Sequence, residues 1–345
     1  MSSAAATPAT EVLLPGTVDP GGLQVRTRHL PPPATGRVLL RMDATGVSFA
    51  EQQMRRGKYY DQPPFPFVPG YDVVGTVVAT GPGVDPALTG RRFAAVTKTG
   101  AWASLLHLDA ADLVPVPDGV TAAAAETVAV NGVTAWQMLH RTAHVPHGAT
   151  IVVLGANGGV GSTLVQLARH AGMTVIGTAS TRHHDTVRRL GATPVDYRDP
   201  AVYRRIRDLA PHGVDAVFDH VGGPGLQDSW RLLRRGGVLV SYGTAATKDE
   251  DGNSRLPVLK LFARLALWNL LPNGRSAHFY NFWAGRRRPE AFRARLREDL
   301  TQVLALLADG TLTAQVAAEF PLREAAAALA LAESRTVAGK VVIVP

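Results

Sequence analysis

The sequence predicts an α/β protein of two domains, in which a doubly wound parallel-sheet domain is inserted into a strand-rich domain. The length of 345 residues exceeds the roughly 250 to 300 residues at which one hydrophobic core stops growing. From residue 38 to about 120, short β-like runs alternate with Pro and Gly. From Thr150, apolar strands alternate with amphipathic helices. We expect residues 1–122 and 286–345 to form the first domain and residues 123–285 the second.

The first domain is expected to hold strands at 38–42, 73–78 and 93–96. Residues 1–10 are rich in Ala, Ser and Thr, and we interpret them as a short flexible lead. The stretch 114–119, Val-Pro-Val-Pro-Asp-Gly, interrupts any regular element. An Ala-rich helix is predicted directly after Thr121, a suitable N-cap, and the domain boundary is placed there.

The second domain begins with a continuous apolar run at 150–154, which is typical of a strand buried in a parallel sheet. Val160, Leu164 and Leu167 then recur at helical spacing, which predicts a helix. Further strands are predicted at 174–178, 215–219 and 238–242, and a helix at 226–233 lies between the last two strands. The alternation predicts parallel strands with right-handed helical crossovers.

The segment after residue 285 is expected to return to the first domain. It contains a predicted helix from Arg286 to Leu307, an Ala-rich helical stretch at 323–333 and a β-rich run at 340–344. If the last run joins the first domain's sheet, the second domain is an insertion.

Composition excludes several classes of protein. The chain has no Cys, which removes disulfides, thiolate nucleophiles and zinc sites with sulfur ligands. No apolar run reaches the ~18 residues of a bilayer span, and the first residues lack the features of a secretory signal. We therefore expect a cytoplasmic protein without a membrane partner.

A net charge of +8 and the arginine-rich segment 286–297 raise the alternative of nucleic-acid binding. Glu290, Glu298 and Asp299 dilute the charge there. We favour a solvated helix face, and no nucleic-acid partner is expected.

A glycine-rich loop follows the first strand of the second domain and precedes its helix. In that position glycine lets the backbone turn tightly and approach a pyrophosphate, and the helix N-terminus offers free N–H groups to the phosphates. The sequence therefore predicts a dinucleotide site. Its residues are Gly155, Asn157, Gly158, Gly159, Val160 and Gly161.

The choice of cofactor is decided at the end of the second strand. NAD-specific sites carry an Asp or Glu there, whereas this chain has Ser180, Thr181 and Arg182 with no acid before Asp185. Hydroxyls and a guanidinium suit a 2′-phosphate, so we predict NADPH. The alternative is that these are ordinary helix-cap and surface residues.

Several stretches spread over nearly the whole chain match the motifs of one family, namely Ala44–Ser48, Gly57–Tyr60, Pro64–Gly75, Thr134–Trp136, Gly155–Gly161, Leu190–Ala192 and Asp219–Gly223. In these stretches the chain resembles the medium-chain dehydrogenase/reductase superfamily, specifically its zinc-free quinone oxidoreductase (zeta-crystallin-like) branch. The resemblance implies a GroES-like catalytic domain, a Rossmann domain, an active-site cleft between them and homodimers formed through the edge strands of the Rossmann sheets.

The chain departs from the zinc-dependent members of that superfamily. Where they place a Cys and a His-Glu pair, this chain has Ser48, Tyr71 and Asp72. A serine hydroxyl and a phenol are poor zinc ligands, so no metal site is expected. Zinc-free relatives often carry Asn at the position of Ser48, which puts in doubt how substrate hydrogen bonding is arranged here.

The resemblance and the missing metal ligands together imply hydride transfer from NADPH to a quinone or an α,β-unsaturated carbonyl. The acceptor's oxygen then needs a hydrogen-bond donor. Our hypothesis assigns this role to Tyr59 or Tyr71, with Ser48 assisting. The alternative is that both tyrosines are packing residues.

The resemblance also suggests which further residues line the cofactor. Thr134 is placed near the nicotinamide and Tyr197 near the adenosine phosphate. Gly243 is expected to let the backbone pass close to the nicotinamide ribose. The remaining suggested residues are Asn157, Gly222 and Tyr242.

Two other functions stay open. One is a pathway-specific enoyl reductase or a zinc-free alcohol dehydrogenase of secondary metabolism. The other is a non-catalytic nucleotide-binding or RNA-binding relative that uses the arginine-rich segment. The aromatic-rich region 256–283 is interpreted as a dimer edge, because 277–283 has strand-like composition, or alternatively as a wall of the substrate pocket.

Overall fold

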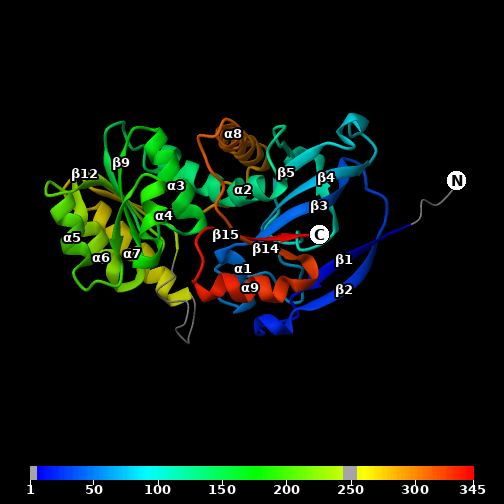
Figure 1. Cartoon of the computed structure of the whole chain (residues 1–345), viewed down its shortest axis with the longest axis horizontal. Coiled ribbons are helices and arrows are strands. Elements are labelled where there is room, and N and C mark those ends of the chain that lie inside the picture. The colour runs from blue at the N-terminus through cyan, green and yellow to red at the C-terminus, as the bar shows by residue number, and fades with distance from the viewer. Residues whose placement is uncertain (1–5, 244–254) are drawn as a thin grey trace. The chain divides into compact units, whose positions relative to one another are not determined.

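The computed structural model describes residues 6–243 and 255–345 (Figure 1). Contacts divide the chain into a first unit, Met1–Val133 with Gly285–Pro345, and a second unit, Thr134–Ala284. The first division falls inside one helix, α2 (Ala122–Trp136), whose start is capped by the Thr121 hydroxyl accepting from the Ala124 amide at 3.2 Å. The sequence places the divisions at 122/123 and 285/286.

The first unit is built on a seven-stranded sheet in the order β14-β15-β3-β4-β5-β7, with β6 paired to β3 and a separate β1-β2 ribbon. Its strands are β1 (Thr7–Leu13), β2 (Gln24–Leu30), β3 (Arg37–Val47), β4 (Asp72–Thr80), β5 (Arg92–Val96), β6 (Leu105–Asp109), β7 (Val114–Pro115), β14 (Val316–Pro321) and β15 (Lys340–Val344). Its helices besides α2 are α1 (Phe49–Arg55), α8 (Pro289–Ala308) and α9 (Ala325–Ser334).

The last strand of the chain lies beside one of the first. Val341 to Ile343 of β15 pair antiparallel with Thr45 to Val47 of β3, and α9 packs its buried Ala328 and Leu329 into the same core as Leu40 and Trp102. The expected return of this segment to the first domain is confirmed.

The second unit is a parallel sheet in the order β10-β9-β8-β11-β12-β13. The strands are β8 (Thr150–Val153), β9 (Thr174–Ala179), β10 (Thr193–Asp196), β11 (Val214–Asp219), β12 (Leu233–Ser241) and β13 (Ser276–Phe279). The helices are α3 (Gly159–His170), α4 (His184–Arg189), α5 (Val202–Leu209), α6 (Leu226–Leu232) and α7 (Arg255–Asn269). The predicted doubly wound sheet is confirmed.

Helices cover both faces of this sheet. Ile176 of β9 points into a core with Ile206 of α5, Trp230 of α6 and Leu265 of α7. The next residue, Gly177, faces the opposite side, where a Cβ atom would lie 3.1 Å from Val187 of α4. Successive strand residues point to opposite faces, so α4 lies on the face opposite to α5, α6 and α7.

Three local predictions are wrong. Thr7 to Thr10 lie in β1, not in a flexible lead, because β2 supplies a distant partner strand for them. The helix expected from Arg286 begins at Pro289, which is favoured at a first helical position. Val114 and Pro115, in the stretch expected to be irregular, form β7 against β5.

Within the ranges 6–243 and 255–345, no helix combines the length and the apolar character required to cross a bilayer.

Candidate functional site

The glycine-rich loop connects β8 to α3, and two close approaches define its shape. Gly155 has φ +71°, and a Cβ atom there would lie 2.4 Å from the His220 ring. A Cβ atom on Gly161 would lie 2.2 Å from the Gly155 carbonyl oxygen. A side chain at either position would collide with the chain itself, so glycine is required for the tight turn and for the close packing of α3 on the loop. These are two of the roles that glycines play in a dinucleotide-binding loop.

The start of α3 has features that favour the binding of an anion. Gly158 is its N-cap and has no side chain with which to satisfy the first helical N–H groups. The Ser162 amide is the first to bond back into the helix, donating to the Gly158 carbonyl at 2.8 Å. The amides of Gly159, Val160 and Gly161 lie in the first turn, where the positive end of the helix dipole favours phosphate.

Other predicted cofactor residues follow the neighbouring strands at the same edge of the sheet. Loops after β8, β9, β11 and β12 all leave from the carboxyl ends of parallel strands, which is where open α/β sheets bind ligands. After β11, the Gly222 amide donates to Asp219 Oδ1 at 2.8 Å. After β12, the Tyr242 amide donates to the Asp219 carbonyl at 2.9 Å, and Gly243 follows directly. Burial raises the pKa of Tyr242, so its phenol stays protonated.

His220 belongs to this loop cluster and was missed by sequence reasoning. Its Nδ1 lies 3.0 Å from the Leu154 carbonyl oxygen, and its ring occupies the space beside Gly155. The tight fit between a histidine ring after β11 and a glycine after the neighbouring strand β8 joins residues far apart in the sequence, so it leaves no mark in a local sequence pattern.

The residues predicted to read a 2′-phosphate lie at the end of β9. Ser180 is buried, and Arg182 is exposed. The Thr181 hydroxyl donates to Asp196 Oδ2 at 2.5 Å, so this hydroxyl is already engaged. Tyr197 is exposed just beyond β10, with the guanidinium of Arg198 5.6 Å from its ring centroid. Thr134 lies on α2 and is buried.

The three predicted catalytic residues belong to one hydrogen-bonded network of the first unit. The hydroxyls of Tyr59 and Tyr71 lie 2.9 Å apart. Ser48 and Tyr71 are linked through the buried Glu51, whose Oε2 accepts from the Ser48 amide at 2.8 Å and whose Oε1 accepts from the Tyr71 amide at 2.6 Å. The Ser48 hydroxyl also donates to Oε2.

Burial governs the protonation of this network. It raises the pKa of Glu51, although the bond from Ser48 acts in the opposite direction. Burial, reinforced by the neighbouring phenols Tyr71 and Tyr60, raises the pKa of Tyr59. A phenol that holds its proton is a hydrogen-bond donor rather than a base. Glu51 was missed, although Ser48-x-x-Glu51 is a capping-box pattern at the start of α1.

Asp72, at a position where zinc-dependent relatives bind metal, is part of a buried ion-pair cluster. Its Oδ2 lies 2.7 Å from Lys340 Nζ, which also lies 2.6 Å from Glu126 Oε1. The Val130 amide donates to Asp72 Oδ2 at 3.0 Å. Burial would lower the pKa of Lys340, but the two carboxylates outweigh it and raise that pKa. Asp72 therefore has a structural partner from the far end of the sequence.

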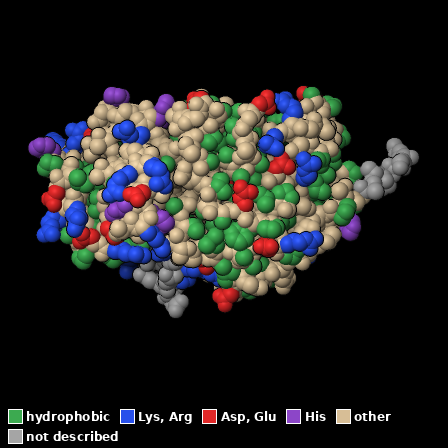
Figure 2. Space-filling view, in the orientation of Figure 1, with side chains coloured by type: hydrophobic (Ala, Val, Ile, Leu, Met, Phe, Trp, Pro, Cys, Tyr) green, Lys and Arg blue, Asp and Glu red, His purple; other side chains and the backbone are tan. Residues whose placement is uncertain are grey.

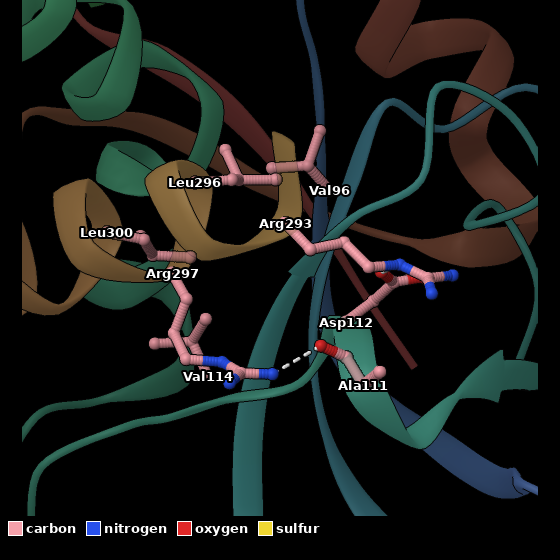
Figure 3. A pocket seen from close by; sticks show the side chains of 8 residues that line it. All are labelled: Val96, Ala111, Asp112, Val114, Arg293, Leu296, Arg297 and Leu300. Carbon is pink, nitrogen blue, oxygen red and sulfur yellow. Dashed lines mark hydrogen bonds and ion pairs between the residues drawn. The ribbon is translucent and has the colours of Figure 1, made fainter. Parts of the chain in front are cut away.

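The arginine-rich segment 286–297 is largely committed to contacts within the first unit. Arg293 forms ion pairs with Asp109 at 2.8 Å and Asp112 at 2.7 Å, and Arg297 donates to a backbone carbonyl beside a shallow pocket (Figure 3). On the face in Figure 2, Lys and Arg side chains are scattered among Asp and Glu.

The chain combines a doubly wound parallel sheet and glycine-rich loop of the dinucleotide-binding kind with a separate strand-rich unit. This combination is typical of two-domain dehydrogenases. Two family models match the chain: the alcohol dehydrogenase GroES-like domain at residues 34–118 and a zinc-binding dehydrogenase domain at residues 190–343.

Relatives and solved structures agree with these models. The chain is 30% identical over 336 residues to the synaptic vesicle membrane protein VAT-1 homolog of Rattus norvegicus, covering 96% of this chain and 82% of that protein. It is 31% identical over 332 residues to a 2-haloacrylate reductase of a Burkholderia species, covering 91% and 92%.

Two solved structures superpose over nearly the whole chain. One is a mycobacterial protein in complex with NADPH, with a TM-score of 0.82, 28% identity and coverage of 98% of this chain and 100% of that chain. The other is a Pseudomonas syringae quinone oxidoreductase, with a TM-score of 0.84, 25% identity and coverage of 98% and 100%. The chain belongs to the medium-chain dehydrogenase/reductase superfamily, in its zinc-free quinone oxidoreductase branch.

Proposed function

We propose that the protein is an NADPH-dependent oxidoreductase that reduces a quinone or an α,β-unsaturated carbonyl compound without zinc. The observation that carries the proposal is the loop around Gly155 and Gly161, where no Cβ atom fits and a helix N-terminus follows. The matched mycobacterial structure holds NADPH. The other matches that support the proposal are a quinone oxidoreductase and a 2-haloacrylate reductase.

NADPH, when bound, supplies the hydride. The amides of Gly159, Val160 and Gly161 would hold its pyrophosphate, and Arg182 with Ser180 and Thr181 would hold its 2′-phosphate, for which the Thr181 hydroxyl would have to leave Asp196. The remaining proposed cofactor contacts are made by Thr134, Asn157, Tyr197, Gly222, Tyr242 and Gly243.

The proposed role of the Ser48–Tyr59–Tyr71 network is to stabilise the acceptor's oxygen as negative charge develops there. A buried phenol with a raised pKa keeps its proton and can donate a hydrogen bond to that oxygen. Glu51 positions Ser48 and the Tyr71 backbone, since it bonds to both.

The test is NADPH binding followed by turnover. Nicotinamide fluorescence should show saturable binding of NADPH and at least tenfold weaker binding of NADH, and Arg182→Ala should reduce that preference. NADPH oxidation should then be measured against a quinone panel and an enone panel that includes 2-haloacrylates. Quinone turnover alone would exclude an enoyl reductase, and turnover of neither panel would contradict the proposal even if NADPH binds.

We also propose a homodimer formed through the edge strands of the Rossmann sheet and a cytoplasmic location. β13 lies at an edge of the sheet, which supports edge pairing. Both backbone groups of Ala277 are bonded to the Asn269 carboxamide, at 2.7 and 2.8 Å, so pairing there would replace these two bonds. The molar mass in solution and cell fractionation test the two proposals.

A further inference from the structure

Two cations converge on one carboxylate in the loop that carries Tyr59. Lys98 Nζ lies 2.7 Å from Asp61 Oδ2, and Arg286 Nη1 lies 2.8 Å from the same oxygen. We call Asp61, Lys98 and Arg286 the Asp61 triad. All three belong to the first unit, although Arg286 comes from the segment that returns after the inserted unit. Their side chains are partly shielded, with exposed fractions of 33% for Asp61, 21% for Lys98 and 52% for Arg286.

The Asp61 triad carries an uncompensated positive charge. The hydrogen bond from Lys98 lowers the pKa of Asp61, so this carboxyl group is ionised at neutral pH. One carboxylate and two cations leave a net charge of +1. An ammonium and a guanidinium each have several N–H donors, and the bonds to Asp61 use one donor of Lys98 and one of Arg286. The triad can therefore accept a second anion without losing Asp61.

The Asp61 triad is attached to both members of the tyrosine pair. Asp61 follows Tyr59 and Tyr60, whose ring centroids lie 4.7 Å apart. The Lys98 amide donates to the Tyr71 carbonyl at 3.1 Å. The positive charge thus belongs to the same loops as the phenols that are proposed to meet the acceptor's oxygen.

Lys98 has a backbone conformation that a lysine rarely adopts. Its φ of +69° lies in the left-handed region, where a residue with a long side chain is strained. An ion pair between partly exposed groups contributes little to stability, so the bond to Asp61 does not by itself account for a lysine here. Strained residues are concentrated at ligand-binding sites, which points to a binding role for the Lys98 ammonium group.

We propose that Lys98 and Arg286 bind a carboxylate of the acceptor, so that the substrate is a conjugated carbonyl compound that also carries an acid group. This inference rests on the proposed function and narrows its substrate class. A net charge of +1 balances a monoanion, and a guanidinium pairs well with a carboxylate. The chemistry is unchanged: one carbon of the C=C bond receives the hydride, the other receives a proton from solvent, and the carboxylate is not altered.

Two other roles of the Asp61 triad predict different kinetics. A neutral quinone or enone would leave the positive charge without a counterion, and loss of either cation would then not affect its binding. If the triad instead stabilised the charge that develops on the acceptor's oxygen, loss of a cation would lower kcat for charged and neutral acceptors alike. A bound carboxylate predicts a change in affinity for charged acceptors only.

The first test is calorimetric binding to the full-length protein in the presence of NADP⁺. The ligands are β-benzoylpropionate, a saturated keto acid that cannot be reduced at a C=C bond, and its neutral methyl ester. We expect the acid to bind about tenfold more tightly than the ester, and Lys98→Met or Arg286→Met to remove this preference without changing ester affinity. Lys98→Arg should retain it. Arg287→Met, at the exposed neighbour of Arg286, removes the same charge and is the matched control; it should bind the acid as wild type does.

The second test is turnover of the unsaturated pair, β-benzoylacrylate and its methyl ester, with NADPH. The chain has no Cys that would react with these compounds. We expect a lower KM for the acid, and Lys98→Met or Arg286→Met should raise that KM about tenfold with little change in kcat. Circular dichroism and the thermal midpoint establish that each variant is folded.

The outcomes separate this inference from the proposed function. Equal binding of the saturated acid and its ester, or no binding of the acid, would overturn the inference, while turnover of the ester would still support the proposed function. A preference for the acid in binding, lost in both methionine variants, would support the carboxylate site even if neither unsaturated compound is reduced. A fall in kcat for both compounds, with the binding preference unchanged, would assign the triad to the developing oxyanion instead.

Discussion

Single atoms determine whether the glycine loop can form. The loop depends on the absence of a Cβ atom at Gly155 and Gly161, while Gly158 is less constrained: a Cβ atom there would lie 3.4 Å from its nearest neighbour, at an ordinary φ of −78°. The tyrosine pair likewise depends on a single hydrogen bond, between the hydroxyls of Tyr59 and Tyr71.

Gly161→Ala should weaken NADPH binding by at least about tenfold, which is about 1.4 kcal/mol, because the new methyl group forces the Gly155 carbonyl to move. Gly21→Ala, where a Cβ atom would meet nothing within 4 Å, is the control and should bind NADPH within about twofold of wild type. Fluorescence titration measures both. Equal affinities in the two variants would show that the close approach at Gly161 does not shape the site.

Tyr59→Phe and Tyr71→Phe should each leave NADPH affinity unchanged, and the variant that lacks the donor should lose roughly 10²- to 10³-fold in kcat, the effect of removing one hydrogen-bond donor to a developing oxyanion. Because burial raises the pKa of Tyr59 above its ordinary value of 10.0, the phenol stays protonated at neutral and moderately alkaline pH. The wild-type rate should show no loss from phenol ionisation up to about pH 10. Unchanged kcat in both variants would remove the donor hypothesis.

At the scale of elements, β15 joins the two ends of the first unit. It pairs with β3 and carries Lys340 to the buried carboxylates of β4 and α2. Removing one member of a buried ion pair leaves an uncompensated charge, which costs more than the pair itself contributes.

Lys340→Met should lower the free energy of unfolding by about 3–5 kcal/mol, measured by urea denaturation. Burial raises the pKa of Glu126 well above 4.5, against the lowering effect of Lys340. The folded state thus holds the proton to higher pH than the unfolded state, and stability falls as pH rises between the two pKa values. Without Lys340 the variant should gain stability as the pH is lowered from 8 to 5.

The double variant Asp72→Asn with Lys340→Met provides the control, because it removes one of the two orphaned charges. It should recover part of the lost stability at pH 8. A Lys340→Met variant as stable as wild type, with no pH dependence, would contradict this account of the cluster.

Short-range patterns explain which elements the sequence predicts. The strand at Thr150, the loop at Gly155 and α3 follow one another in the chain, so local periodicity and glycine placement suffice. The Lys340 to Asp72 pair spans 268 residues, and β1 depends on its pairing with β2 and on backbone bonds to Trp102 and Ser104. Such contacts depend on tertiary neighbours that a local pattern does not record, and α7 was missed because apolar residues on two sides obscure its period.

At the scale of the whole molecule, association depends on β13, which forms one edge of the parallel sheet. Unpaired edge strands are templates for association, and the Asn269 carboxamide occupies both backbone groups of Ala277 in the manner of a neighbouring strand. This side chain therefore competes with any partner strand.

Asn269→Ala should strengthen dimerisation, because it frees the Ala277 amide and carbonyl for a second chain. Sedimentation velocity at several concentrations measures the association constant, which we expect to rise at least threefold. Asn273→Ala, in the adjacent turn, is a control that leaves the edge bonds intact. A fall in association for Asn269→Ala would instead make Asn269 part of the contact.

The pairing of β15 with β3 has a consequence for biosynthesis. During translation the ribosome delivers β3 early, then the entire inserted sheet, and β15 only after that. The inserted unit can fold while the nascent first unit still lacks the strand that pairs with β3 and the lysine that lies between two buried carboxylates. A chaperone that shields the vacant β3 edge during this interval would act on the first unit, and its removal should cause aggregation that begins there.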